Sequence, residues 1–190
     1  MGLTHDELRS RLRTTCATVD SEDLSSGPGV PAAVLVGLLA HPQEPQVILT
    51  RRQAGLKDHA AQISLPGGRV EPTDAGPADA ALREAFEEIG IAREQVELLG
   101  CLPPHVTVSD FRVYPFVGWI EPRVELVIDP SEVAEVFTVP LSFVLDPANH
   151  HYEMAVIDGR QREFWVIPYP GRRIWGATAG ILVNLARALA

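Results

Sequence analysis

Lysine is nearly absent from this 190-residue sequence, which is also poor in cysteine and in aromatic residues. Lys57 is the single lysine among 16 basic residues, and the 25 acidic residues give a formal net charge of -9. This charge argues against a general affinity for nucleic acid backbones. A local site for a phosphorylated small molecule stays open, because arginine, the dominant base, binds phosphate bidentately. The arginine usage is equally consistent with the composition of a GC-rich genome.

Cys16 and Cys101 are too few and too far apart in sequence to form a disulfide framework or a metal site. We expect them to be free thiols of a reducing cytosol. The N-terminus is acidic where a signal peptide would need an apolar core. The longest apolar run, 30–40, is about half of the ~20 residues that a membrane span needs. The sequence therefore predicts a cytoplasmic protein without a membrane segment, with one domain over 1–190.

Apolar periodicity and turn residues predict a mixed fold of strands and helices. Several strands follow one another as hairpins with helices between them, so we expect an α/β (α+β) architecture, a mixed sheet sandwiched between helices. Thr4 and Glu7 form a capping-box pattern at the first helix. The predicted strands are 32–40, 46–52, a short piece at 62–65, 96–102, 112–120, 152–157 and 163–168; the predicted helices are 4–13, 77–89, 131–137 and 178–189.

Three glutamates fall within five positions of the predicted helix 77–89, namely Glu84, Glu87 and Glu88. At 100° per residue they share the side opposite to the apolar one, and Arg83 lies one turn before Glu87, where an i,i+4 ion pair can form. A solvated acidic face on an amphipathic helix is one interpretation. The apolar side is predicted to contain Ala78, Leu82, Ala85, Phe86 and Ile89.

The segment before this helix, LPGGRVEPTD over 65–74, favours a different interpretation of the glutamates. A Pro-Gly-Gly turn allows the backbone to come close to whatever lies in front of the helix. Carboxylates from one helix face together with a glycine carbonyl are ligands for a hard cation. Clustered carboxylates become stable when Mg²⁺ or Mn²⁺ neutralises them, and such ions hold a pyrophosphate and activate a water molecule.

Gly68 and the run REAFEEIGI over 83–91 resemble the Nudix box: Gly, five residues, Glu, seven residues, then Arg-Glu-apolar-any-Glu-Glu-any-Gly-apolar. The second half of this pattern is matched at every specified position. The first half departs, because Asp74 stands where the pattern has Glu, and eight residues rather than seven precede Arg83. The resemblance implies a Nudix fold with its box over 68–91, preceded by an extension over 1–29.

A second signature, LTRRQAGLKDHAAQISLPGG over 49–68, resembles the coenzyme A diphosphatase branch of that family. Leu49, Thr50, Arg52 and the Pro-Gly-Gly match with the correct spacing, whereas Gln53 and Ala61 depart from the pattern. The resemblance implies metal-dependent hydrolysis of a diphosphate linkage, with coenzyme A cut into 3′,5′-ADP and 4′-phosphopantetheine.

The same resemblance implies roles for particular side chains. The metal ligands are expected to be Glu84 and Glu88, with Glu87 and the carbonyl of Gly68 completing the set, and Arg83 orienting the carboxylates. The general base is expected to be Glu84 itself or a carboxylate of the SEVAEVF stretch, either Glu132 or Glu135; a solvated helix face is the alternative for these two. Residues expected to contact the phosphates are Arg52, Lys57 and His59, with Arg51 beside them, or else these are ordinary charges of a strand and loop.

Other functions fit part of the pattern. A Nudix enzyme acting on ADP-ribose, NADH or an acyl-CoA would carry the same box, since the box binds metal and diphosphate rather than the flanking groups. A non-catalytic Nudix binding module usually loses box carboxylates, and here all three are present. A structural domain with an acidic helix leaves the Gly-Gly turn unexplained. The apolar region 174–189 is compatible with a homodimer.

Overall fold

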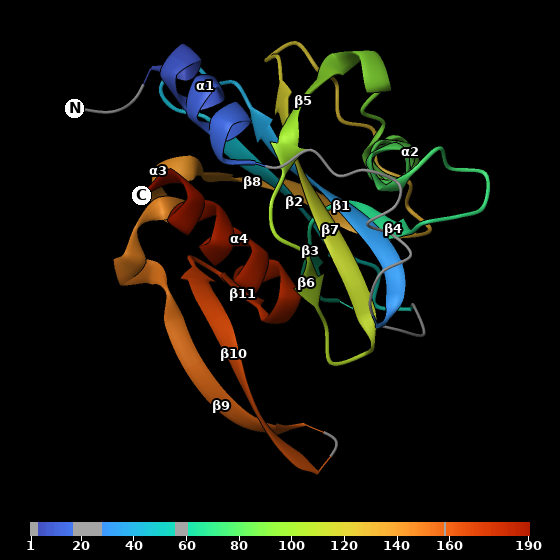
Figure 1. The fold of residues 1–190 in the computed structure, drawn as a ribbon, viewed down its shortest axis with the longest axis vertical. Coiled ribbons are helices and arrows are strands. Elements are labelled where there is room, and N and C mark those ends of the chain that lie inside the picture. Colours follow the sequence, from blue (N-terminus) through green and yellow to red (C-terminus); the bar gives the residue numbers. More distant parts are fainter. Residues whose placement is uncertain (1–3, 17–27, 56–60, 158) are drawn as a thin grey trace.

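A computed structural model describes residues 4–16, 28–55, 61–157 and 159–190, which form two β-sheets with helices packed against them (Figure 1). The large sheet contains β1 (Val30–Leu39), β2 (Gln46–Arg52), β3 (Ile63–Ser64), β4 (Gly67–Arg69), β5 (Val96–Cys101), β6 (His105–Val106), β7 (Phe111–Ile120) and β8 (Val133–Pro140). The small sheet contains β9 (His151–Ile157), β10 (Arg160–Tyr169) and β11 (Arg172–Trp175). The helices are α1 (His5–Thr15), α2 (Pro77–Ile89), α3 (Leu141–Leu145) and α4 (Gly176–Leu189), with short 3₁₀ turns η2 (Arg93–Gln95) and η3 (Pro147–Asn149).

The large sheet is mixed, as predicted. β1 and β7 run parallel and pair over ten residues, from Val30 opposite Phe111 to Leu39 opposite Ile120. The other strand pairs of the sheet are antiparallel, including the predicted hairpin of β1 and β2. β1 is the central strand, with β7 on one side and both β2 and β4 on the other.

β1 and β2 pair directly only at one end, where Leu38 lies opposite Val47. Beyond that point the segment 63–69 lies between them: its first part pairs with β2 as β3, and its last part pairs with β1 as β4. The Pro66 carbonyl accepts a hydrogen bond from the Leu35 N–H at 2.8 Å, which fixes the crossing. The Pro-Gly-Gly turn is therefore an inserted part of the sheet.

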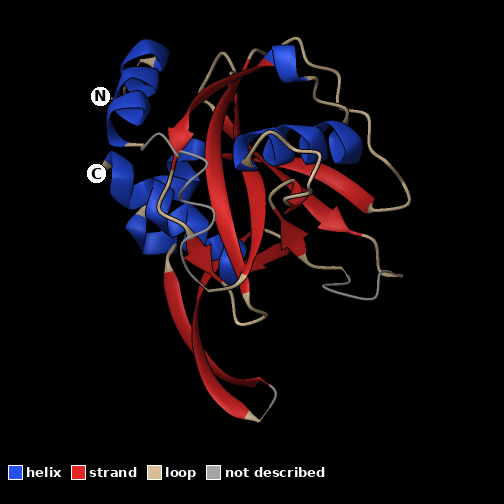
Figure 2. Cartoon of the chain, turned by 45° about the vertical axis from the view of Figure 1, so that its right-hand side comes forward, coloured by secondary structure: helices blue, strands red, loops and turns tan. Residues whose placement is uncertain are grey.

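Helices cover both faces of the large sheet (Figure 2). On one face α2 packs over a cluster that includes Leu35, Ile48 and Ile120. On the other face α4 and α1 bury a larger cluster that includes Val36 and Leu38. Neighbouring residues of β1 thus point to opposite layers, as the pleat of a strand requires. The sandwiched sheet predicted from the sequence is confirmed.

The helix predicted over 131–137 is wrong, because this stretch leads into β8. β8 pairs with β2 from Gln46 opposite Pro140 to Arg52 opposite Val133, with an irregularity between Arg51 and Arg52. The short strands β4, β6 and β11 and the helix α3 also had no counterpart in the prediction. The predicted helices at both ends of the chain are confirmed, and Thr4 and Glu7 form the expected capping box of α1.

The hairpin of β9 and β10 extends away from the body of the protein (Figure 1). Its exposed apolar side chains include Met154 and Val156. α4 packs against β10 and β11, so the small sheet is joined to the face of the large sheet opposite α2. Within the described ranges, no helix combines the length and apolarity that a membrane crossing requires.

Candidate functional site

The box helix α2 begins and ends as predicted. Pro77 occupies its first turn, and Gly90 ends it in the left-handed conformation with φ 75°. Its apolar side is rotated from the predicted one, because the small side chains of Ala80 and Ala81 pack into a cluster with Tyr114 and Phe116. This rotation turns Phe86 outward, where it is 59% exposed. The prediction that Phe86 is buried with the apolar side is wrong.

The same rotation carries Glu88 inward, so that its side chain is only 3% exposed. Arg52 of β2 approaches it, with Nη1 3.6 Å from Oε1. Glu88 Oε2 and Arg52 Nε are buried without a hydrogen-bond partner. Burial raises the pKa of Glu88 to about 8, while Arg52 and the Gly67 N–H act in the opposite direction. A buried carboxylate with an unsatisfied oxygen is energetically unfavourable. A cation or a hydrogen-bond donor from a ligand would stabilise it.

Arg83 connects four groups around the helix. Its Nη1 donates to Glu84 Oε1 at 2.9 Å and to Glu87 Oε2 at 3.0 Å, which includes the i,i+4 pair predicted from the sequence. Its Nη2 donates to the carbonyl oxygen of Arg69 at 3.1 Å. Asp74 first, and then Glu84, raise the pKa of Arg83 above its ordinary value against the effect of burial, so Arg83 stays charged. Arg83 therefore holds the carboxylate of Glu84, a partly buried group whose pKa burial raises.

Asp74, the residue at the departure from the family pattern, binds Arg83 from the other side. Its Oδ1 accepts from Arg83 Nε at 2.8 Å and its Oδ2 from Arg83 Nη2 at 3.1 Å, a bidentate pair. Asp74 Oδ2 also accepts from the Glu71 N–H at 2.7 Å, which closes the turn before α2. The bond from Arg83 is the main cause that lowers the pKa of Asp74. Residue spacing gave no signal for this pairing.

Both positions of the Gly-Gly turn need glycine, because other atoms of the protein approach their backbone too closely for a side chain. Gly67 has φ 155° and packs against the backbone of Ala33 and Val34, where any side chain would collide. A Cβ on Gly68 would collide with the carboxylate of Glu84. Backbone and carboxylate therefore share a small volume, which places the carbonyl region of the turn beside the acidic side of α2.

The residues present fit a divalent cation in their chemistry. Glu84 and Glu88 lie one turn apart, Glu88 buried and Glu84 partly buried, and Gly68 packs directly against Glu84. Carboxylate and carbonyl oxygens are the donors that Mg²⁺ and Mn²⁺ take. Over the described parts of the chain, no three His, Cys, Asp or Glu side chains converge closely enough to hold a metal ion. Here arginines hold the carboxylates, Glu84 and Glu87 through Arg83 and Glu88 through Arg52.

The two candidate bases lie in different places. The charge of Glu132, just before β8, lies close enough to Glu84 and Glu88 to raise the pKa of both. Glu135 instead accepts from Arg51 and from Arg172 of β11. It shares its side of β8 with Phe137, which packs in the cluster beneath α4, whereas Val136 packs beneath α2. Of the two, Glu132 is therefore on the side of the box.

Of the three residues expected to contact phosphate, the structure places Arg52, which lies against Glu88. Lys57 and His59 lie outside the described residues. Cys16 and Cys101 are both buried and free, as expected. Trp165 packs at the edge of the large core cluster, while Trp175 lines a hollow at the surface.

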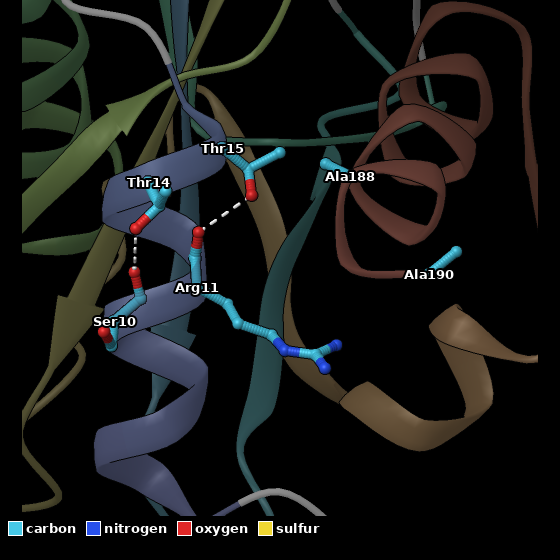
Figure 3. Close-up of a pocket in the computed structure, with 6 residues that line it drawn as sticks. All are labelled: Ser10, Arg11, Thr14, Thr15, Ala188 and Ala190. Atoms are coloured by element: carbon cyan, nitrogen blue, oxygen red, sulfur yellow. Dashed lines mark hydrogen bonds between the residues drawn. The ribbon is translucent and has the colours of Figure 1, made fainter.

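A hollow of about 290 Å³ lies between α1 and α4, away from the box helix (Figure 3). The hydroxyls of Thr14 and Thr15 donate to carbonyls within α1, from Ser10 and Arg11. Arg11 donates to the Leu189 carbonyl of α4. Arg11 thus joins the first and last helices, while the two threonines bond within α1, and we assign this hollow to helix packing.

Known proteins resemble this chain over most of its length. The NUDIX domain family matches residues 30–157. A protein of Citrobacter koseri named as an uncharacterized Nudix hydrolase NudL is 39% identical over 185 residues, which cover 97% of this chain and 94% of that protein. The protein of the same name from Escherichia coli K12 is 38% identical over the same shares. The chain belongs to the Nudix hydrolase family, and the predicted class of enzyme is confirmed.

Solved structures confirm the fold. A MutT/nudix family protein from Enterococcus faecalis superposes with a TM-score of 0.56 at 16% identity, covering 97% of this chain and 73% of that one. An Ap4A hydrolase of C. elegans in a binary complex gives a TM-score of 0.50 at 22% identity, covering 58% of this chain and 80% of that one. At these identities the likeness concerns the architecture alone.

Proposed function

We propose that this chain hydrolyses a diphosphate linkage in a nucleoside diphosphate derivative with the help of Mg²⁺ or Mn²⁺, and that coenzyme A is its substrate. The observation that carries the proposal is the pair Glu84 and Glu88. On one turn of α2, Glu88 is buried with an unsatisfied oxygen, and Glu84 is partly buried against Gly68. A purely structural acidic helix would keep these carboxylates in water.

Glu84 and Glu88 would hold the cations together with Glu87 and the Gly68 carbonyl. When bound, the cations supply the positive charge that a diphosphate needs as a water molecule attacks it. Arg83 fixes the orientation of Glu84, and Arg52 offsets the charge of Glu88. Glu132 lies on the same side and is our candidate to take the proton from the water. Glu135 does not suit this role, because two arginines hold it on the other side of β8.

The choice of coenzyme A rests on the signature over 49–68, which includes Arg52 and the Pro-Gly-Gly turn. Two contacts support this choice: Arg52 approaches Glu88, and Gly67 and Gly68 belong to β4, which packs against α2. ADP-ribose, NADH and acyl-CoA are the competing substrates. A NUDIX domain of Shewanella oneidensis NrtR, similar in fold, has been solved with ADP-ribose.

The test is hydrolysis of coenzyme A, acetyl-CoA, ADP-ribose, NADH and a nucleoside triphosphate in Mg²⁺ and in Mn²⁺, with products identified by mass. We expect 3′,5′-ADP from coenzyme A. In Glu88→Gln we expect kcat/KM to fall by a factor of about 100 or more, because a ligand of the cation is lost. Binding of Mn²⁺, followed by electron paramagnetic resonance, should weaken in parallel.

Glu94→Gln, on an exposed turn after α2, is the matched control and should keep full activity. A circular dichroism spectrum and Tm of Glu88→Gln show whether the variant is folded. Cleavage of ADP-ribose or NADH in place of coenzyme A would keep the metal site and remove the assigned substrate. Undiminished hydrolysis by a folded Glu88→Gln variant would refute the metal site itself.

A further inference from the structure

A second hollow, of about 490 Å³, lies on the face of the large sheet opposite α2. Its walls come from the end of β2, from β3, from β8 and from β11. The lining side chains include Arg51, Ile63, Glu135, Arg172, Arg173 and Trp175. Arg172 shows which face of the sheet this is, because its guanidinium lies 4.1 Å from the ring centre of Phe137. Phe137 belongs to the cluster beneath α4.

Positive charge exceeds negative charge around this hollow. Arg51 and Arg172 share one carboxylate, that of Glu135, and Arg173 pairs with Glu153 at 2.6 Å. Three guanidinium groups carry about 15 N–H donors between them, whereas two carboxylates offer only about eight acceptor positions. The hollow therefore has donors to spare for the oxygens of an anion, on a chain whose overall charge is -9.

An aromatic ring forms part of the same wall. Trp175 is only partly buried, and its ring packs edgewise on Phe164 at 5.5 Å between ring centres. The guanidinium of Arg173 lies 5.7 Å from the ring centre of Trp175. A flat apolar surface beside clustered arginines suits a ligand that combines a heteroaromatic base with a phosphate.

The hollow and the box lie at the same end of the sheet. Arg51 and Arg52 are the last two residues of β2, and because side chains of a strand alternate, they point to opposite faces. Arg52 faces Glu88 of the box, and Arg51 lines the hollow. The box and the hollow therefore flank the end of β2 on its two faces, so a substrate that occupied both would pass around the end of this strand.

We propose that this hollow is a specificity site for a phosphate monoester on the ribose of the substrate's nucleoside half, which in coenzyme A is the 3′-phosphate. Arg172 and Arg51 bind the phosphate, and Trp175 contacts the base. The assignment rests on the proposed function for the identity of the substrate, while binding of the nucleotide half can be measured without turnover.

The first arm is calorimetry without metal, using adenosine 3′,5′-bisphosphate and 5′-AMP, which differ only by the ribose phosphate. We expect the wild type to bind the bisphosphate more tightly by a factor of about ten or more, and Arg172→Gln to lose this preference. Arg160→Gln, an exposed residue at the start of β10, makes the same charge change and should keep it. Arg51→Gln, at a more exposed position, serves if Arg172→Gln fails to fold.

Equal affinity of the wild type for both nucleotides would overturn the proposal. So would competition by inorganic phosphate as strong as that by the bisphosphate, which would mean a general anion site. The second arm compares coenzyme A with 3′-dephospho-coenzyme A as substrates: Arg172→Gln should raise KM for the first and leave the second unchanged. If the wild type cleaves neither, the proposed function fails, and the calorimetry still decides the nucleotide site.

Discussion

Asp74 is a residue whose role follows from its contacts rather than from its place in the pattern. It holds Arg83 through two hydrogen bonds and closes the turn that begins at Glu71. Arg83 in turn orients Glu84. The extra residue in the loop therefore does not disrupt the box, because the carboxylate still reaches the guanidinium from outside the helix. We infer that Asp74 positions Arg83 and does not bind the cation.

Replacing Asp74 should make the free energy of unfolding less dependent on pH in the acid range. The pKa of Asp74 is lowered in the folded state, mainly by Arg83, so its contribution is present above the unfolded pKa of about 3.9 and is lost as pH falls through the folded pKa. For Asp74→Asn we expect a loss of about 1–3 kcal/mol in the free energy of unfolding at pH 7. Urea titrations from pH 7 down to pH 3 measure this loss.

The difference between wild type and Asp74→Asn should shrink at the acid end of that series. Asp79→Asn is a suitable comparison, since Asp79 lies at the start of the same helix but bonds the Ala75 N–H and pairs with the exposed Arg93 rather than with Arg83. A loss that stays constant from pH 7 to pH 3 would mean that the ionic pair with Arg83 is not its source.

At the scale of single residues, the sequence singled out three carboxylates of one helix as site candidates but did not predict their surroundings. Glu84 and Glu88 follow from the box and from helical periodicity. The burial of Glu88 does not, because it depends on how far α2 is rotated by alanine packing on Tyr114 and Phe116. Its contact with Arg52 joins two elements distant in sequence, and local patterns contain no information on such pairs.

At the scale of elements, the stretch SEVAEVF has a local apolar pattern that predicts a helix, whereas pairing with a neighbouring strand favours a β-strand. Val133, Val136 and Phe137 have the i, i+3, i+4 spacing of a helix face. The chain instead forms β8, because β2 offers an edge along its whole length, from Gln46 to Arg52. Tertiary pairing prevails over a short periodic signal. By contrast α2, with its Pro and Gly punctuation, was predicted with the bounds that the structure shows.

The capping box of α1 permits a prediction for one element. Thr4 Oγ1 accepts from the Glu7 N–H at 3.3 Å, and the Glu7 carboxylate accepts from the Thr4 N–H at 2.8 Å. Because Thr4→Ala removes one of these partners, we expect the free energy of unfolding to fall by about 1 kcal/mol. Chemical denaturation followed by circular dichroism measures the change.

The matched control is Thr14→Ala near the other end of α1. The Thr14 hydroxyl bonds the Ser10 carbonyl of its own helix at 2.9 Å and caps nothing. Since alanine is the better helix former, this variant should be neutral or slightly more stable. If Thr4→Ala matched Thr14→Ala in stability, the cap would contribute nothing to α1 in the folded protein.

For the whole molecule, the sequence indicated the layers and the mixed character of the sheet but not its order. The hairpin of β1 and β2 is local and was predicted. The parallel pairing of β1 with β7, and the insertion of 63–69 between β1 and β2, depend on contacts between remote segments. The hollow at Arg51 and Arg172 is likewise formed only when β11 packs near β3.

A fragment of residues 1–104 tests how far the fold depends on that pairing. It contains α1, β1 to β5 and α2, and it lacks β7, which borders the central strand, together with β6, β8, the small sheet, α3 and α4. We expect no cooperative thermal unfolding and strong binding of the dye ANS, because one edge of β1 and its apolar faces are uncovered. The full chain is the control. A cooperative transition of the fragment near the Tm of the full chain would show that β7 is dispensable.

The ten-residue parallel pair of β1 and β7 also sets an order of events during synthesis. Val30 pairs with Phe111 and Leu39 with Ile120. The central pair of the sheet therefore cannot form until residues 111–120 have been synthesised. The box helix is complete in sequence long before then, but the surface on which it packs is not. Folding is therefore expected to be slow and late, with the acidic helix packed onto a complete central pair only after Ile120 has been synthesised.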